Sequence, residues 1–128
     1  MTYYVWYSSY NVRRNTFERI LNMISSDVIR GYTDIIILYL LMDEPSYGYE
    51  ISRKISDRSQ GLYTMKETTL YSAFNRLEKN GYLRSFAGTE TGGKTRTYYE
   101  LTPQGHTHYQ LKKDEWLITK KVVDQFIK

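Results

Sequence analysis

An almost uninterrupted apolar run from Ile35 to Met42 is the feature that most constrains the fold of this chain. A helix that is apolar nearly all round belongs inside a protein core, so Thr33–Asp43 is predicted to be a buried helix. The run is far shorter than the roughly 20 residues that a membrane span requires. Pro45 stops the helix, and the rest of this small chain is expected to pack around it.

Two amphipathic helices are predicted to follow. Ser46 is expected to cap Tyr47–Arg58, and Gly48 in its first turn indicates close approach of another helix, because glycine otherwise costs about 1 kcal/mol of helix propensity. Lys66–Asn80 repeats apolar residues at i, i+3, i+4 and i+7, and Gly81 suits the left-handed position after it. The inward-facing residues of the two helices are Ile51, Ile55, Leu70, Ala73, Phe74 and Leu77.

Two strand-like runs, Tyr82–Ala87 and Thr95–Leu101, come next and are rich in tyrosine and threonine. The polar segment Gly88–Lys94 between them contains a Gly-Gly pair, which predicts the turn of a β-hairpin. The hairpin is basic, and its cations are Arg84, Lys94 and Arg96.

A long helix, Pro103–Ile127, is predicted to end the chain, with Thr102 as its cap and Pro103 in the first helical position. A helix of about 25 residues extends roughly 37 Å, which is longer than the small core can cover. Its surplus apolar surface needs a partner, and a second copy of the chain is expected to supply it. The predicted dimer interface comprises Leu111, Trp116, Ile118, Val122, Val123, Phe126 and Ile127.

The first thirty residues differ in character from the rest. Residues 1–14 form an aromatic arm that is either disordered or docked on another surface. Residues 15–30 are predicted to form an extra helix and a link, with Asn15 as the cap, Glu18 completing a capping box, and Gly31 ending or kinking the helix. Its apolar stripe follows helical spacing and consists of Phe17, Ile20, Leu21 and Ile24.

Composition excludes several classes of protein. The absence of cysteine rules out disulfides, thiol nucleophiles and cysteine zinc sites, and fits a cytoplasmic location. The formal net charge of +4 and the pI of about 9.2 favour a polyanionic partner.

His106 and His108 are two residues apart on the predicted final helix, so their side chains point in different directions and do not form a metal-binding pair. With no catalytic motif present, we expect a protein that is not an enzyme and has no catalytic residues, metal, cofactor or membrane partner.

The order of elements predicts a mainly α fold with a small β-hairpin. Residues 31–101 form a winged helix-turn-helix DNA-binding domain, and residues 102–128 form the dimerisation helix. In such a unit the third helix enters the major groove of DNA and the hairpin is the wing. The face of Lys66–Asn80 opposite its apolar stripe is free of carboxylates along its centre and consists of Thr68, Ser72, Asn75 and Lys79, flanked by Tyr71 and Arg76.

Four segments resemble one family of bacterial regulators, the PadR family. They are YGYEI (47–51), TLY (69–71), RLEKNGYL (76–83) and GGKTRTYYELTPQG (92–105). Any one of them alone is weak, but they agree with the family in order and spacing. The resemblance covers about Arg30 to Ile127, and it departs from the family at the N-terminus, where about thirty extra residues precede the buried helix.

The resemblance implies a dimeric winged-helix repressor of genes for detoxification, drug efflux or phenolic-acid metabolism, with the last helix forming most of the dimer interface. It places Tyr71 near DNA and Tyr47 at the DNA backbone. It also suggests that Trp116 stacks on a small aromatic effector; plain packing in the interface is the alternative. The complete predicted DNA-binding set is Tyr47, Lys66, Thr68, Thr69, Tyr71, Ser72, Asn75, Arg76, Lys79, Lys94 and Arg96.

The function predicted from these features is sequence-specific regulation of transcription. A homodimer would bind a palindromic site on double-stranded DNA through two recognition helices about 34–36 Å apart. The alternative is a winged-helix module that binds another protein through the aromatic N-terminal arm. The basic wing distinguishes the two functions, because a protein-binding module does not need it.

Overall fold

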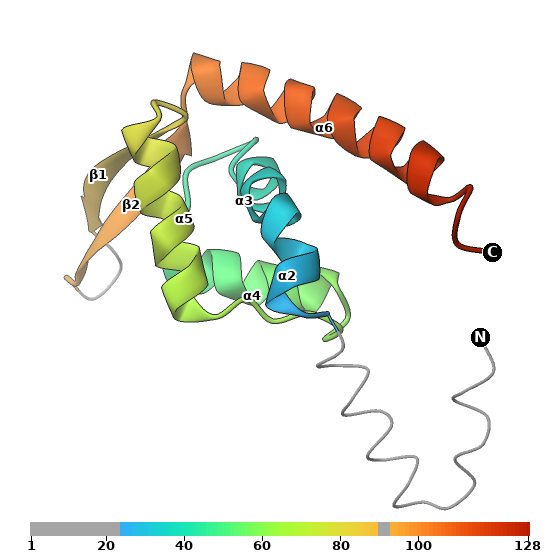
Figure 1. Cartoon of the computed structure of the whole chain (residues 1–128). Helices are drawn as coiled ribbons and strands as arrows, with labels where there is room; N and C mark the ends of the chain where they lie inside the picture. Colours follow the sequence, from blue (N-terminus) through green and yellow to red (C-terminus); the bar gives the residue numbers. More distant parts are fainter. Residues whose placement is uncertain (1–23, 90–92) are drawn as a thin grey trace, which may run out of the picture.

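The computed structural model of the chain describes residues 24–89 and 93–128. A one-turn helix, three longer helices, a hairpin and a long final helix follow one another (Figure 1). The predicted aromatic arm and residues 15–23 of the predicted extra helix lie outside the described residues. The elements, in chain order, are α2 (Ser26–Ile29), a 3-10 turn η1 (Arg30–Tyr32), α3 (Thr33–Leu40), α4 (Gly48–Arg58), α5 (Glu67–Lys79), β1 (Leu83–Thr89), β2 (Thr95–Leu101) and α6 (Pro103–Val123).

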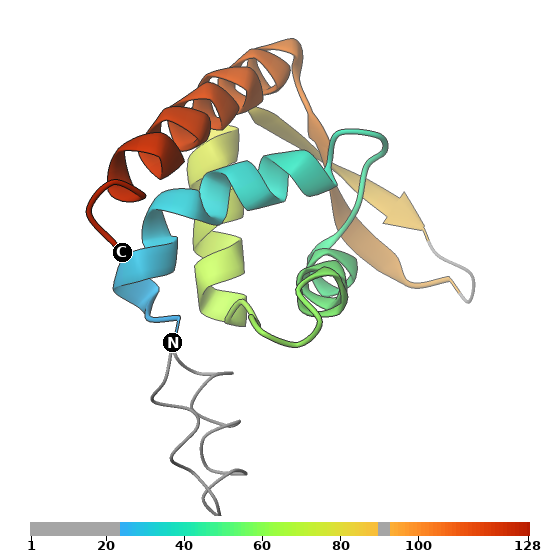
Figure 2. The ribbon, with the colours of Figure 1, turned by 90° about the vertical axis from the view of Figure 1, so that its right-hand side faces the viewer.

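The core lies where α3, α4 and α5 meet, with the base of the hairpin closing one side (Figure 2). Phe74 of α5 is fully buried and stacks on Tyr99 of β2, with ring centroids 4.1 Å apart. All six residues predicted to face inward from α4 and α5 are buried, so helical spacing identified these faces correctly. The buried hydrophobic residues are Ile37, Leu38, Leu41, Ile51, Ile55, Met65, Leu70, Ala73, Phe74, Leu77, Leu83 and Tyr99.

The connection between α3 and α4 differs from the prediction. Helix α3 ends at Leu40, before the predicted Asp43, and α4 begins at Gly48 after an uncapped Tyr47. Ser46 is not a helix cap. Instead its backbone pairs with that of Tyr99, with N···O distances of 3.1 and 2.8 Å, and forms an isolated β-bridge. This pairing fixes the backbone of Ser46 against the hairpin, and its buried hydroxyl donates a hydrogen bond to Glu50.

The first strand of the hairpin extends further toward the turn than predicted. Strands β1 and β2 pair antiparallel from Leu83 opposite Leu101 to Thr89 opposite Thr95. Gly88, predicted to lie in the turn, belongs to β1. A Cβ atom there would clash with the ring of Tyr98, so the strand continues because glycine leaves room for that ring.

Helix α6 begins as predicted and ends earlier. The Thr102 hydroxyl accepts a hydrogen bond from the Gly105 N–H at 3.0 Å, and proline occupies the first helical position. The helix ends at Val123, four residues before the predicted Ile127. It crosses α3 and then runs past the helical body (Figure 1). Gly81 has a φ of +84°, which confirms the predicted left-handed stop after α5.

Helices α2 and α3 are joined through Gly31, where the sequence predicted an end or a kink. The backbone there tightens into the turn η1 and then continues as α3. The ring of Tyr32 at the end of this turn meets Trp116 of α6 edge-on, with centroids 5.0 Å apart. Within residues 24–89 and 93–128, no helix is both long and apolar enough to span a membrane.

Candidate DNA-binding surface

The outer face of α5 is set by its inner face. Four apolar residues bury one side of the helix in the core, so the opposite side must face away from the protein. Thr68, Ser72, Asn75 and Lys79 are all exposed, as the helical period predicts. Lys66, which immediately precedes the helix, is exposed, whereas Thr69 is half-buried.

One flank of α5 is tied to α3. The guanidinium of Arg76 forms an ion pair with the Asp34 carboxylate, and their side chains are 49% and 23% exposed. The sequence does not indicate that Asp34 is the partner of Arg76, because the two residues are far apart in the chain. The ion pair holds Arg76 to the side of the outer face and neutralises one predicted DNA-contacting cation.

The other flank of α5 carries Tyr71. Its ring packs edge-on against Phe74, with centroids 5.8 Å apart, and its hydroxyl end lies over Gly48 of α4. The close helix approach predicted from Gly48 is therefore confirmed. Because 41% of Tyr71 remains exposed, one side of the ring still faces solvent between α4 and the outer face of α5.

The wing is attached to α5 through Glu78. The carboxylate of Glu78 accepts hydrogen bonds from both the backbone N–H of Ser85, at 3.2 Å, and the Ser85 hydroxyl. On the same strand, Arg84 pairs across the hairpin with Glu100 at 2.6 Å. Glu78 thus orients the wing, and Arg84 is engaged by a carboxylate of the opposite strand.

A second contact joins the wing to the start of α4. The guanidinium carbon of Arg96 lies 4.3 Å from the centre of the Tyr47 ring, and that ring packs on Tyr98 with centroids 5.3 Å apart. Tyr98 also stacks on Phe86, at 5.7 Å. Strand alternation places Arg96 and Tyr98 on the same side of β2, so the sequence held a signal for this cluster that residue-type reasoning missed.

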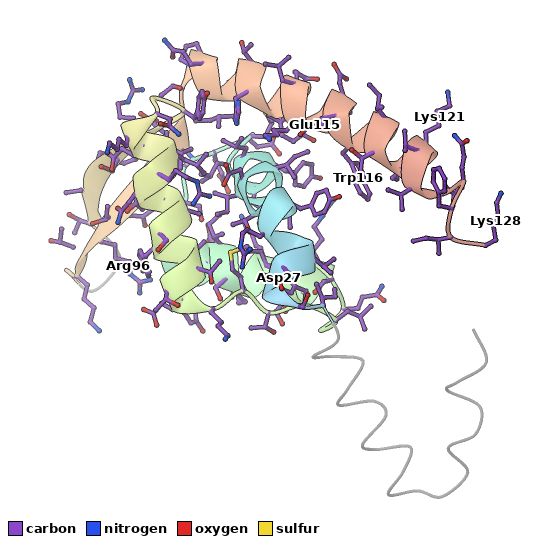
Figure 3. The ribbon with its side chains drawn as sticks, viewed as in Figure 1. Asp27, Arg96, Glu115, Trp116, Lys121 and Lys128 are labelled. Atoms are coloured by element: carbon purple, nitrogen blue, oxygen red, sulfur yellow. The ribbon has the colours of Figure 1, made fainter. Side chains whose placement is uncertain are left out.

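The structure brings most of the predicted set onto one side of the molecule. Residues of the α5 outer face adjoin Tyr71, Tyr71 adjoins the start of α4, and Tyr47 there contacts the wing through Arg96. Figure 3 shows Arg96 on the hairpin and Trp116 on α6, on opposite sides of the molecule. Lys94 is exposed beside the turn. Together these residues form a polar and basic surface suited to a polyanion.

Helix α6 and the residues that follow it carry the predicted interface residues away from this surface. Six of the seven are between 43% and 81% exposed, and Trp116 is 39% exposed. The Lys120 ammonium lies 5.5 Å from the centre of the Trp116 ring. His108, on the same helix, stacks on Tyr82 at 3.9 Å, and burial lowers its pKa. No group of metal-binding side chains was found in the part of the chain that the structure describes.

These elements define a winged helix-turn-helix protein: a three-helix unit whose third helix has an exposed polar face, followed by a hairpin wing and a long helix. The model of the Transcriptional regulator PadR-like family matches residues 37–111, and the chain belongs to this family.

Relatives support this assignment. A solved transcriptional regulator from Clostridium thermocellum is 59% identical, with a TM-score of 0.76, covering 80% of this chain and 100% of its own. A PadR family transcription regulator from Clostridium difficile is 37% identical, with a TM-score of 0.67, over 76% of this chain and 99% of its own. A Lysinibacillus sphaericus protein described as uncharacterised is 40% identical, over 82% of this chain and 96% of its own.

Proposed function

We propose that this regulator is a sequence-specific repressor that binds palindromic DNA as a homodimer, with α5 in the major groove. The observation that carries the proposal is the exposed outer face of α5, which presents the neutral polar side chains of Thr68, Ser72 and Asn75. Asparagine suits bidentate recognition of adenine, and serine and threonine hydroxyls suit several base edges. Lys79, the exposed last residue of the helix, would contact phosphate.

The wing and the start of α4 supply the contacts that position the protein on DNA. Lys94 is exposed, and the contact between Arg96 and Tyr47 links the wing to α4. Basic residues in a wing bind phosphates or an adjacent minor groove. Tyr47 immediately precedes α4 and contacts Arg96 of the wing, and this position supports the role at the DNA backbone that the family resemblance suggested for it.

The homodimer would form through α6. Leu111 and Ile118 are 63% and 64% exposed on a face that no described element covers, and Val122 continues the same stripe. Burial of apolar surface drives association, at roughly 25 cal/mol per Å² before the costs of ordering. The proposed interface is completed by Trp116, Val123, Phe126 and Ile127, in agreement with the sequence-based set.

A small aromatic effector bound at Trp116 stays a prediction, as does plain packing of this ring. A titration with planar aromatic cations, followed by Trp116 fluorescence in a Trp6→Phe variant, distinguishes the two. A saturable change supports an effector site, whereas no change at high ligand concentration supports packing. The edge-on contact with Tyr32 leaves the ring only partly covered in either case.

The proposal is tested by fluorescence anisotropy with the DNA upstream of the protein's own gene and with scrambled DNA, across a salt series. Phosphate contacts predict that log affinity falls linearly with log salt, by about 0.9 per neutralised phosphate. Upstream DNA should bind about a thousandfold tighter than scrambled DNA. Equal and weak binding of both would contradict the proposal and favour the protein-interaction module.

A further inference from the structure

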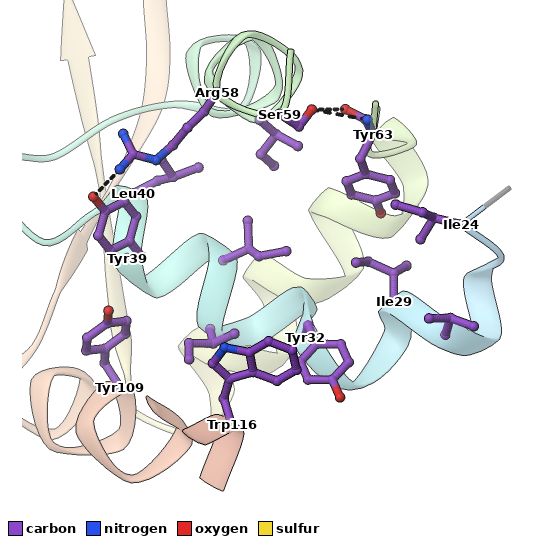
Figure 4. Close-up of a pocket in the computed structure, with 14 residues that line it drawn as sticks. Ile24, Ile29, Tyr32, Tyr39, Leu40, Arg58, Ser59, Tyr63, Tyr109 and Trp116 are labelled. Carbon is purple, nitrogen blue, oxygen red and sulfur yellow. Dashed lines mark hydrogen bonds between the residues drawn. The ribbon is translucent and has the colours of Figure 1, made fainter. Parts of the chain in front are cut away.

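Two hollows of about 630 Å³ each border α3, and one is apolar while the other is polar. The apolar hollow is drawn in Figure 4 and is lined in part by Trp116, so it adjoins the dimer interface proposed above. The polar hollow lies between the start of α3, the flank of α5 that carries Arg76, and the middle of α6. It shares Thr68 and Ser72 with the outer face of α5, so it continues the candidate DNA-binding surface sideways.

The polar hollow is lined by cations from three different elements. Arg30 comes from the turn η1, Arg76 from α5 and Lys112 from α6. Among the described residues, its lining holds one carboxylate, that of Asp34, which pairs with Arg76. The hollow therefore carries more positive than negative charge, which favours a phosphate group. Hydroxyl groups such as that of Ser72 are suitable donors to phosphate oxygens.

The other two cations form ion pairs at the surface. Arg30 pairs with Asp27 at 3.0 Å, and Lys112 pairs with Glu115 at 3.3 Å. The carboxylates of Asp27 and Glu115, both labelled in Figure 3, are 84% and 68% exposed, and neither lines the polar hollow. Exposed pairs of this kind contribute little to stability, so a phosphate in the hollow can replace each carboxylate as the partner of its cation.

The hollow lies on the flank of α5 that faces away from the wing. At about 100° per residue, Arg76 lies about 140° around α5 from Tyr71 and about 160° from Glu78, which binds the wing. A helix with its side chains is about 10–12 Å across and the major groove is about 12 Å wide, so a helix in the groove has a sugar-phosphate backbone along each flank. The wing and Tyr47 are proposed above to bind one backbone, and the hollow lies on the flank that faces the other.

We infer that the polar hollow binds phosphates of this second DNA backbone, and that Arg30 and Lys112 contact them. Neither residue belongs to the sequence-based DNA-binding set. The inference rests on the proposed function and extends the DNA-binding surface from α5 to η1 and to α6. Because phosphates are the same in every sequence, these two contacts strengthen binding to any DNA and do not contribute to the choice of operator.

The combined substitution Arg30→Gln and Lys112→Gln tests the inference by anisotropy with upstream and scrambled DNA across a salt series. Loss of two phosphate contacts should weaken binding of both DNAs to the same extent, and the slope of log affinity against log salt should become shallower by up to about 1.8. Arg30→Lys with Lys112→Arg keeps both charges and should keep the parent slope. Lys113→Gln with Lys128→Gln is the matched control, because both lysines are exposed and do not line the hollow.

The outcomes separate the hollow from the proposed function. A parent slope in the glutamine variant, an equal reduction in the lysine control, or a loss confined to upstream DNA would overturn the inference. Equal and weak binding of both DNAs by the parent protein contradicts sequence-specific regulation. A parent that prefers upstream DNA, together with an unchanged glutamine variant, overturns the phosphate contacts in the hollow and leaves the proposed function standing.

Discussion

The hydroxyl end of Tyr71 of α5 occupies the space where a side chain on Gly48, the first residue of α4, would lie. A Cβ atom on Gly48 would stand only 2.8 Å from Cζ of Tyr71. The two helices therefore approach closely because residue 48 lacks a side chain. This contact also fixes the position of Tyr71, which the proposed function places beside DNA.

Gly48→Ala is expected to move Tyr71 while changing stability little. The clashing atoms belong to the far end of a partly exposed side chain, which rotates away, and alanine gains about 1 kcal/mol of helix propensity. DNA affinity should fall to that of Tyr71→Ala, and the double variant should lose no more than either single one. Gly31→Ala is the control, because no atom lies within 4 Å of its Cβ position. If the losses of DNA affinity in the two single variants add up in the double variant, Gly48 does not act through Tyr71.

Glu50 is expected to make stability depend on pH in the acid range. The hydrogen bond from Ser46 lowers the pKa of Glu50 below its ordinary 4.5, and Lys54 adds to this effect. The contribution of the Glu50 carboxylate to the free energy of unfolding is therefore present above pH 4.5, and it is lost as the pH falls through the lowered pKa. Glu50→Gln should reduce the free energy of unfolding at pH 7, with the difference shrinking below pH 4.5.

Urea unfolding between pH 3 and pH 7 measures this effect. Glu44→Gln removes the same charge from an exposed position in the loop after α3 and serves as the control. A difference between Glu50→Gln and the parent that stays constant over this range would rule out the hydrogen-bonded carboxylate as its origin.

Asp34→Asn is expected to strengthen binding to DNA of any sequence. The substitution removes one negative charge beside α5 and releases Arg76 from its ion pair. A released arginine adds a phosphate contact, so the salt dependence of log affinity should steepen by up to about 0.9. Anisotropy with scrambled DNA checks this most simply. Asp114→Asn, an exposed position on α6, is the control for net charge; equal gains in both variants would exclude a local effect of Arg76.

Local patterns predicted the parts of the fold that depend on neighbouring residues. The apolar stripe of α5 and the cap at Thr102 are set within one or two helical turns, and both are confirmed. The prediction that Ser46 caps a helix is wrong because its backbone partner, Tyr99, lies in a strand much later in the chain. A serine before a helix has the pattern of a cap whether or not a distant strand binds its backbone.

The candidate site likewise combines features that neighbouring residues set with contacts between residues far apart in the sequence. The outer face of α5 followed from its inner face, because a helix buried on one side exposes the other. The ion pair of Arg76 with Asp34, and the contact of Arg96 with Tyr47, join elements distant in the sequence. Helical period and residue type carry no information on such pairs, so the exposure of the α5 face was predictable and the partners of Arg76 and Arg96 were not.

The outer face of α5 is tested most directly by the combined substitution Thr68→Ala, Ser72→Ala and Asn75→Ala. Good base contacts each contribute about 1–3 kcal/mol of discrimination, so upstream DNA should lose at least tenfold in affinity while scrambled DNA binds as before. Gln104→Ala with Gln110→Ala on α6 is the matched control and should leave both affinities unchanged. Unchanged affinity of the triple variant for upstream DNA would contradict the assignment of α5 as the recognition helix.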